Sequence, residues 1–175
     1  MKRPPLSLKG QALALLARRE HSRAELLVKL LAHSRKRALW AAAEHGEAVG
    51  LAAEAFDTER ATAEVEALLD TLEAAHHLSD ARFAESRVHA RAARQGTARI
   101  RQELARHGVE LDADTARQLR ETELARAREV WRRRFGGELP ADAAGRARQM
   151  RFLASRGFAA EVIRRLVGGR DDAGE

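Results

Sequence analysis

The 175-residue sequence has no cysteine, no tyrosine and only three prolines. Without cysteine the chain cannot form disulfides, use a thiol nucleophile or bind a metal through thiolates. The only aromatic residues are two tryptophans and five phenylalanines. They provide few residues that favour strands and few platforms on which bases could stack. These shortages favour a helical protein and argue against a stacking-based binder of single strands.

Long apolar runs are also missing. The longest, Ala24 to Ala32, is interrupted by Glu25 and Lys29, and it falls well short of the roughly 20 apolar residues that span a membrane. The N-terminal stretch MKRPPLSLKG has basic residues and two prolines but no apolar segment of signal-peptide length. We therefore expect a cytoplasmic protein that does not associate with membranes.

Helix-forming residues and arginine dominate what is present. The sequence is 45% hydrophobic and 33% charged, and its net charge of +6 comes from 28 arginines and 4 lysines against 26 acidic residues. Alanine, leucine, arginine and glutamate are strong helix formers, so we predict an all-α fold. Planar guanidinium groups favour phosphate or carboxylate partners, although an arginine-rich genome would produce the same ratio.

One segment of 13 residues recurs three times along the chain. The copies are SRAELLVKLLAHS at 22–34, GTARIRQELARHG at 96–108 and GRARQMRFLASRG at 145–157. The spacing between the first two copies exceeds that between the last two by about 25 residues, which indicates an insertion near residues 35–59. Each copy has the apolar spacing of one helix.

The ends of the copies carry helix start and stop signals. Ser22 followed by Glu25 is the pattern of a capping box, and we expect Thr97 to cap the second copy through its hydroxyl. Gly108 and Gly157 stand where a left-handed residue ends a helix. The copies are therefore predicted to begin and end alike.

Apolar stripes before and after each copy predict two further helices in each repeat. The sequence thus predicts three tandem three-helix repeats, stacked into an elongated, curved molecule because a unit of about 50 residues buries too little surface to stand alone. The predicted parts are a disordered N-terminus at 1–7, repeat 1 at 8–78 with its insertion, repeat 2 at 79–121, repeat 3 at 122–168 and a disordered tail at 169–175.

Three segments resemble the RecX family of bacterial regulators of the RecA recombinase. They are RREHSRAELLVKL near the front, LSDARFAESRVHARAARQGTARIRQELARHGV at 78–109 and RARQMRFLASRGF near the end. The sequence departs from the family in having Arg94 where a glycine is common, and His76 and His77 where a glycine and an aromatic residue often precede the leucine.

The resemblance implies a function as well as a fold. It implies binding in the groove of the RecA filament on single-stranded DNA, and contact with that DNA either directly or through the filament. From there such proteins modulate, and mainly inhibit, ATP hydrolysis, strand exchange and the co-protease activity that triggers the SOS response. Homologous recombination and DNA repair are the processes concerned. We expect this chain to act as a monomer.

The sequence offers no site for catalysis. It has no nucleophile elbow and no phosphate loop with a lysine, and the seven histidines do not stand at metal-binding spacing with a carboxylate. We expect a non-enzymatic protein without metal or cofactor. A catalytic cluster assembled by the fold from separate repeats is the alternative that a sequence leaves open.

Dense arginines are the candidate contact residues. Arg87, Arg91 and Arg94 fall at i, i+4 and i+7, on one face of one predicted helix, and Glu103 is the only acidic residue between Ser86 and His107. Such a face could be a solvated surface, a grip on nucleic acid or a grip on an acidic protein groove. The candidates for binding RecA or DNA are Arg87, Arg91, Arg94, Arg99, Arg101, Arg132 and Arg133.

The basic surface also supports a second functional hypothesis. The chain could be an independent helical-repeat module that binds DNA without sequence specificity and without a recombinase. Such a module would bind bare DNA with a steep salt dependence.

Overall fold

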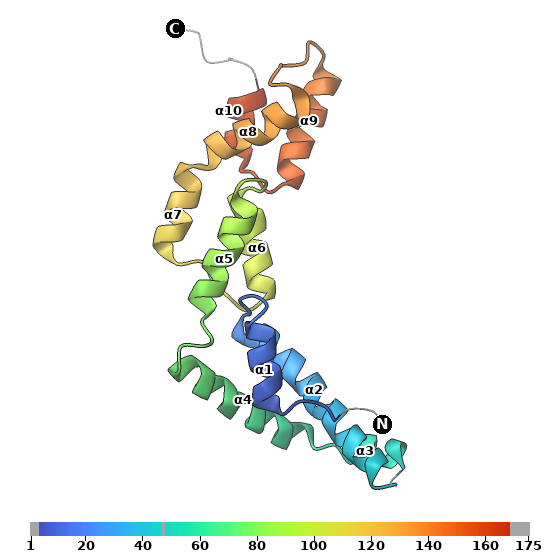
Figure 1. Ribbon diagram of the computed structural model, residues 1–175. Helices are drawn as coiled ribbons and strands as arrows, with labels where there is room; N and C mark the ends of the chain where they lie inside the picture. The colour runs from blue at the N-terminus through green and yellow to red at the C-terminus, as the bar shows by residue number, and fades with distance from the viewer. Residues whose placement is uncertain (1–3, 47, 169–175) are drawn as a thin grey trace. The chain divides into compact units, whose positions relative to one another are not determined.

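Helices make up all of the regular secondary structure in residues 4–46 and 48–168, which a computed structural model describes (Figure 1). No strand occurs within these ranges, and the all-α prediction is confirmed. The helices are α1 Leu8–Leu16, α2 Arg23–Glu44, α3 Val49–Glu54, α4 Thr58–Ala74, α5 Asp80–Ala92, α6 Thr97–Arg106, α7 Ala113–Glu121, α8 Glu123–Phe135, α9 Ala143–Ser155 and α10 Ala160–Val167.

The chain divides into two compact units. Unit 1 ends at Phe83 and unit 2 begins at Ala84, so the division falls inside α5. The predicted disordered tail at 169–175 lies outside the described residues. Of the predicted disordered N-terminus at 1–7, only residues 4–7 are described.

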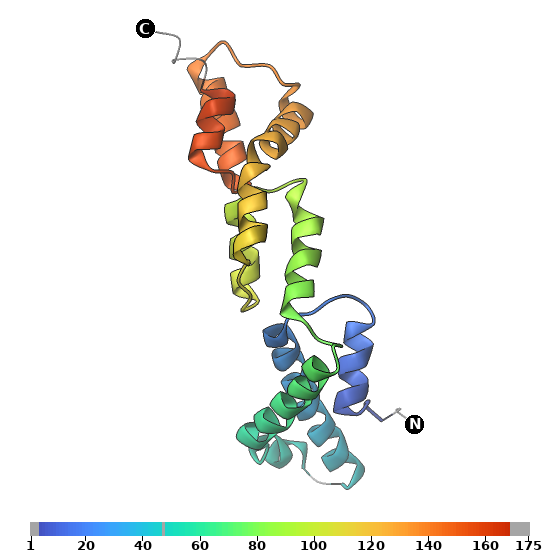
Figure 2. The ribbon, with the colours of Figure 1, turned by 90° about the vertical axis from the view of Figure 1, so that its left-hand side faces the viewer.

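Unit 1 is held together by aliphatic side chains from α1, α2 and α4, which pack side by side (Figures 1 and 2). These side chains recur at helical spacing, so each helix presents one apolar face to the others. The buried members are Leu8, Ala12, Leu26, Leu30, Val65, Leu69, Leu72 and Leu78. Phe83, at the end of the unit, is completely buried, as expected from its place five residues after Leu78.

The central helix of unit 1 is longer than its counterparts in unit 2. α2 spans 22 residues and continues to Glu44, although the repeat pattern placed the end of the copy at Ser34. No glycine or proline stands between Ser34 and His45, and the alanine-rich segment there favours helix. The predicted insertion at 35–59 therefore contributes the second half of α2, the short α3 and the start of α4.

The predicted start signals are only partly right. Ser22 caps α2, because its Oγ accepts a hydrogen bond of 3.1 Å from Glu25 N, but the Glu25 side chain bonds Arg19 instead of completing the box. The prediction for Thr97 is wrong. Gly96 occupies the N-cap of α6, and Thr97 is the first helical residue, with its hydroxyl donating to Leu119 O.

The predicted stop signals are right in unit 2. Gly108 and Gly157 have φ values of +70° and +82°, in the left-handed region that glycine adopts without strain. Unit 1 closes α4 differently, because His76 takes that conformation with φ +57°. This turn is therefore formed by a residue with a side chain, without a glycine.

Unit 2 contains the rest of α5 and the helices α6 to α10. Its apolar core lies among α8, α9 and α10 and is formed by Ala127, Val130, Trp131, Leu153, Phe158, Ile163 and Val167. The buried indole of Trp131 donates from Nε1 to Gln149 Oε1 at 2.7 Å, so its polar atom is satisfied inside the core.

The start of α6 lies against the turn between α9 and α10. Gly96 N donates to Arg156 O at 2.9 Å, and Ala98 N donates to Gly157 O at 3.3 Å. A Cβ at Gly96 would lie 2.1 Å from Gly157 O, so only glycine permits this approach. The carbonyl groups of Arg156 and Gly157 thus accept hydrogen bonds from amides at the start of α6. The N-cap residue Gly96 has no side chain that could accept them.

Two charged side chains complete this junction. Glu123 is only 4% exposed, and its Oε1 accepts hydrogen bonds from Thr97 N at 3.0 Å and Ala159 N at 3.3 Å. Arg126 donates to carbonyl and hydroxyl oxygens of Ala92, Gln95, Thr97, Leu119 and Thr122. Burial lowers the pKa of Arg126, and the charge of Glu123 acts in the opposite direction. We call this set, with Gly96 and Gly157, the polar junction.

Candidate partner-binding surface

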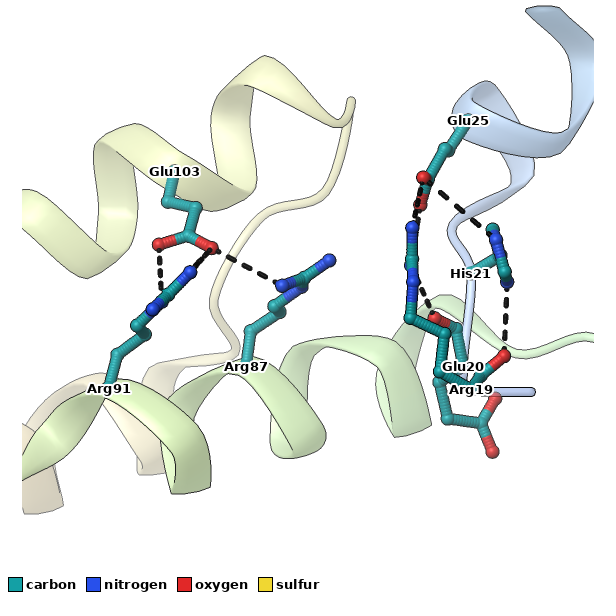
Figure 3. Close-up of polar contacts among 7 residues, drawn as sticks. All are labelled: Arg19, Glu20, His21, Glu25, Arg87, Arg91 and Glu103. Atoms are coloured by element: carbon teal, nitrogen blue, oxygen red, sulfur yellow. Dashed lines mark hydrogen bonds and ion pairs between the residues drawn. The ribbon is translucent and has the colours of Figure 1, made fainter. Parts of the chain in front are cut away.

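Two of the predicted contact arginines are bound to one carboxylate. Arg87 and Arg91 lie one turn apart on α5, and Glu103 faces them from α6 (Figure 3). Arg91 Nε lies 3.0 Å from Glu103 Oε2, and Arg87 Nη1 lies 3.6 Å from Oε1. These guanidinium groups therefore connect two helices of unit 2, and Glu103 offsets part of their charge.

Three other predicted residues have no such partner. Arg94, Arg99 and Arg101 are exposed, and in the described part of the chain none of them forms a salt bridge. The backbone of Arg99 lies close against Gly157. A Cβ added at Gly157 would come within 2.6 Å of the Arg99 N atom. Its charged end is nonetheless on the surface and available to an external anion.

The last two predicted residues share one acid on α8. Arg132 Nη2 and Arg133 Nε lie 2.9 and 2.7 Å from Glu129, and both arginine side chains are 67% exposed. The hydrogen bond from Arg133, aided by the charge of Arg132, lowers the pKa of Glu129. Exposed pairs of this kind contribute little to stability, so an external anion can compete for these arginines.

The fold brings predicted residues of two repeats together at one pocket of about 240 Å³ in unit 2. Arg133 and Arg134 come from α8, and Arg156 is the C-cap residue of α9. Arg94 lies in the turn after α5, which ends at Ala92, so the prediction that it continues the helix of Arg87 and Arg91 is wrong. The remaining lining residues are Ala93, Val130 and Phe152. We call this feature the arginine pocket.

Arg134 and Arg156 were not among the predicted contact residues. Both belong to arginine clusters that are visible in the sequence, but only the fold places them beside Arg94. Arg126 lies near Arg134 in the sequence but has a structural role, because it donates its hydrogen bonds to backbone carbonyls at the polar junction. Density of arginine alone does not separate these roles.

Unit 1 has its own polar cluster around Glu25 (Figure 3). Arg19 forms a forked pair with this carboxylate at 2.5 and 3.0 Å, and this pairing lowers the pKa of Glu25. His21 is buried beside them, with Nδ1 3.0 Å from Arg19 O and Nε2 3.9 Å from Glu25. The cluster fixes the turn between α1 and α2.

Neither a metal site nor a membrane span appears in the described residues. No group of three or more histidine, cysteine or acidic side chains lies close enough to hold a metal ion in residues 4–46 and 48–168. No helix in the same ranges is long and apolar enough to cross a bilayer.

Comparison with known proteins identifies the family. The family description "RecX, second three-helix domain" matches residues 79–113, and "RecX, third three-helix domain" matches residues 121–167. Relatives named "Regulatory protein RecX" include one from Ralstonia nicotianae, 48% identical over 97% of this chain and 91% of the relative. Another, from Leptothrix cholodnii, is 50% identical over 94% of this chain and 90% of the relative. A third, from Pseudomonas entomophila, is 39% identical over 95% of this chain and 94% of the relative. Similarity of this extent, running through all three copies of the recurring helix, means that the chain belongs to the RecX family of regulatory proteins.

Proposed function

We propose that this chain is a non-enzymatic regulator that binds the groove of the RecA filament on single-stranded DNA. There it modulates, and mainly inhibits, the filament's ATPase, strand-exchange and co-protease activities. The observation that carries the proposal is the near full-length similarity to proteins named regulatory protein RecX. Binding across neighbouring RecA protomers would restrain their relative movement, and a regulator needs only a difference in affinity between filament states to act in this way.

The exposed arginines of α6 support this proposal. Arg99 and Arg101 lack an acidic partner in the described ranges, and each can present a planar fork to a carboxylate or phosphate. Arg87 and Arg91 are less suitable for a test by mutation, because their loss would leave the partly buried Glu103 without these partners. Arg99 and Arg101 are therefore the residues to remove.

The test measures ATP hydrolysis by the cognate RecA on single-stranded DNA while this protein is titrated in. The test variant is Arg99→Ala/Arg101→Ala, in which alanine keeps the Cβ of Arg99 that packs near Gly157. We expect the parent protein to suppress hydrolysis and this variant to need roughly 10- to 30-fold more protein, since two lost contacts of about 1 kcal/mol each weaken binding by that factor.

The matched control is Arg117→Ala/Arg120→Ala, which removes the same charge from exposed positions on α7 of the same repeat. It should inhibit like the parent. Unchanged hydrolysis at saturating parent protein would contradict the regulator proposal. Tight binding to bare DNA together with unchanged hydrolysis would instead favour the independent DNA-binding module.

A further inference from the structure

The arginine pocket holds positive charge that the protein itself does not balance. None of its lining residues is acidic, and of its four arginines only Arg133 has a carboxylate partner, Glu129. Arg94, Arg134 and Arg156 form no salt bridge in the described ranges. Like charges that share a small volume repel one another, so an anion from outside would be bound favourably there.

The pocket is also ordered before any ligand arrives. The Arg156 guanidinium lies over the Phe152 ring, 5.1 Å from its centroid, and Phe152 meets Phe135 edge to face at 5.2 Å. The backbone of Arg156 is fixed as well, because its carbonyl accepts the hydrogen bond from Gly96 N. Side chains that are already held in place lose less entropy when they bind a partner.

The number of arginines indicates a phosphate rather than a carboxylate. Elsewhere in unit 2 a single carboxylate is shared by two arginines: Glu103 by Arg87 and Arg91, and Glu129 by Arg132 and Arg133. Three further guanidinium groups around one pocket offer more donors than the two oxygens of a carboxylate can use. A phosphate has more oxygen acceptors and pairs with arginine in the same forked manner.

The remaining walls indicate the source of that phosphate. Phe152 and the small exposed part of the core residue Val130 provide apolar atoms beside the charges, suited to a sugar or a base. At about 240 Å³ the pocket is smaller than the roughly 300 to 1,000 Å³ of sites that enclose small ligands, so its ligand must extend beyond it. On a single strand a base can leave the stack and lie against such a surface next to its own phosphate, whereas in a duplex the bases are stacked and paired.

We infer that the arginine pocket binds a backbone phosphate of a single nucleic-acid strand, with the adjoining sugar or base against Val130 and Phe152. This inference adds to the proposed function a direct contact with the strand. It requires no recombinase, so it can fail while the regulator proposal holds.

The experiment measures binding of a fluorescein-labelled oligothymidylate by fluorescence anisotropy, without recombinase. The pocket variant is Arg94→Ala/Arg156→Ala, and the control is Arg148→Ala/Arg151→Ala, which removes equal charge from exposed positions on α9 outside the pocket. Each phosphate contact on a single strand contributes about 0.7 to the slope of log K against log salt, so loss of the one phosphate held in the pocket should weaken binding roughly 5-fold at about 0.1 M salt.

The slope should also become shallower by about 0.7 in the pocket variant, while the control keeps both the slope and the affinity of the parent. If Arg94→Ala/Arg156→Ala does not fold, Arg94→Ala/Arg134→Ala tests the same pocket without touching the polar junction.

Three results would overturn the inference. Unchanged affinity of the pocket variant for the oligothymidylate would show that the pocket is not the binding site. An equal loss of affinity in the control would show that general surface charge is responsible for binding. Displacement of the oligothymidylate by thymidine monophosphate at an equal nucleotide concentration would make a free nucleotide the occupant instead of the strand. Displacement only at millimolar mononucleotide agrees with the inference.

Discussion

The two units are stabilised by different means. Unit 1 relies on a stripe of leucines shared by α1, α2 and α4, and two of its salt bridges, Arg23 with Asp70 and Arg82 with Glu20, are partly exposed. Unit 2 has an apolar core among α8, α9 and α10, and it adds the polar junction, in which Glu123 is buried and two glycines touch. Apolar packing tolerates small shifts, whereas hydrogen bonds to fixed backbone atoms do not. Unit 2 should therefore be the more sensitive to small chemical changes.

The largest effect is expected for Gly96→Ala in the polar junction. Its added Cβ would overlap Gly157 O at 2.1 Å, and relief requires α6 to move away from the turn between α9 and α10. We expect the free energy of unfolding to fall by about 3 kcal/mol, measured by urea denaturation. Hydrogen exchange should locate the loss of protection in unit 2, and loss confined to unit 1 would contradict this account.

Gly136→Ala separates this contact from backbone conformation. Gly136 has φ +75°, but a Cβ there would meet nothing within 4 Å. The cost should be only that of a left-handed alanine, about 1 kcal/mol. Equal losses for the two glycine variants would mean that the close approach at Gly96 contributes nothing of its own.

The next largest effect is expected for Arg126→Ala. This change removes the donor for several half-buried oxygens around the polar junction, including Gln95 O and Leu119 O, and should cost about 2 kcal/mol of unfolding free energy. Arg91→Ala, which breaks a partly exposed pair with Glu103, should cost less than about 1 kcal/mol. Urea denaturation of both variants measures the difference, and similar costs would remove the distinction between structural and surface arginines.

A smaller and pH-dependent effect is expected in unit 1. Burial lowers the pKa of His21 below its ordinary value of 6.5, and the hydrogen bond to Arg19 O acts in the opposite direction. The folded state therefore binds this proton less readily than the unfolded state. The stability linked to neutral His21 is complete above pH 6.5 and is lost as the pH falls below that value.

The measurement compares the unfolding free energy of the parent and of His21→Gln across this pH range. The parent should lose more stability than the variant as the medium is acidified, because only the parent has a side chain here that binds a proton more readily in the unfolded state. Glutamine can still donate to the Arg19 carbonyl. Parallel pH profiles would show that the imidazole of His21 is not responsible.

The smallest effect is a gain in unit 1. His76 adopts φ +57° at the end of α4, a conformation that costs a residue with a Cβ about 1 kcal/mol. We expect His76→Gly to raise the unfolding free energy by roughly 0.5 to 1 kcal/mol. The greater conformational entropy of glycine in the unfolded chain reduces this gain. The matched control, His77→Gly, should give no gain, because the φ of His77 is not positive.

Much of the fold could be predicted because its signals are local. The spacing of apolar residues predicted that the fold is helical, and Gly108 and Gly157 predicted helix ends. The failures arose where distant parts of the chain meet. Thr97 has the residue type of an N-cap, but carbonyl groups of the third repeat satisfy amides at the start of this helix and the hydroxyl turns to Leu119.

The candidate site was less accessible to prediction for the same reason. The sequence identified the exposed Arg94, Arg99 and Arg101, but it gave equal standing to Arg87 and Arg91, which Glu103 holds from a separate helix. Arg156 lines the arginine pocket together with Arg94 but is distant from it in the sequence. The spacing of residues within a single helix cannot predict such a contact.

The start of α6 has a consequence for how such chains evolve. Because the carbonyl groups of Arg156 and Gly157 serve as its cap, the second repeat depends on the third for the beginning of one of its own helices. A gene rearrangement that deleted or exchanged the third repeat alone would leave those amides without acceptors. The smallest block that can be transplanted between proteins without that loss therefore contains both repeats.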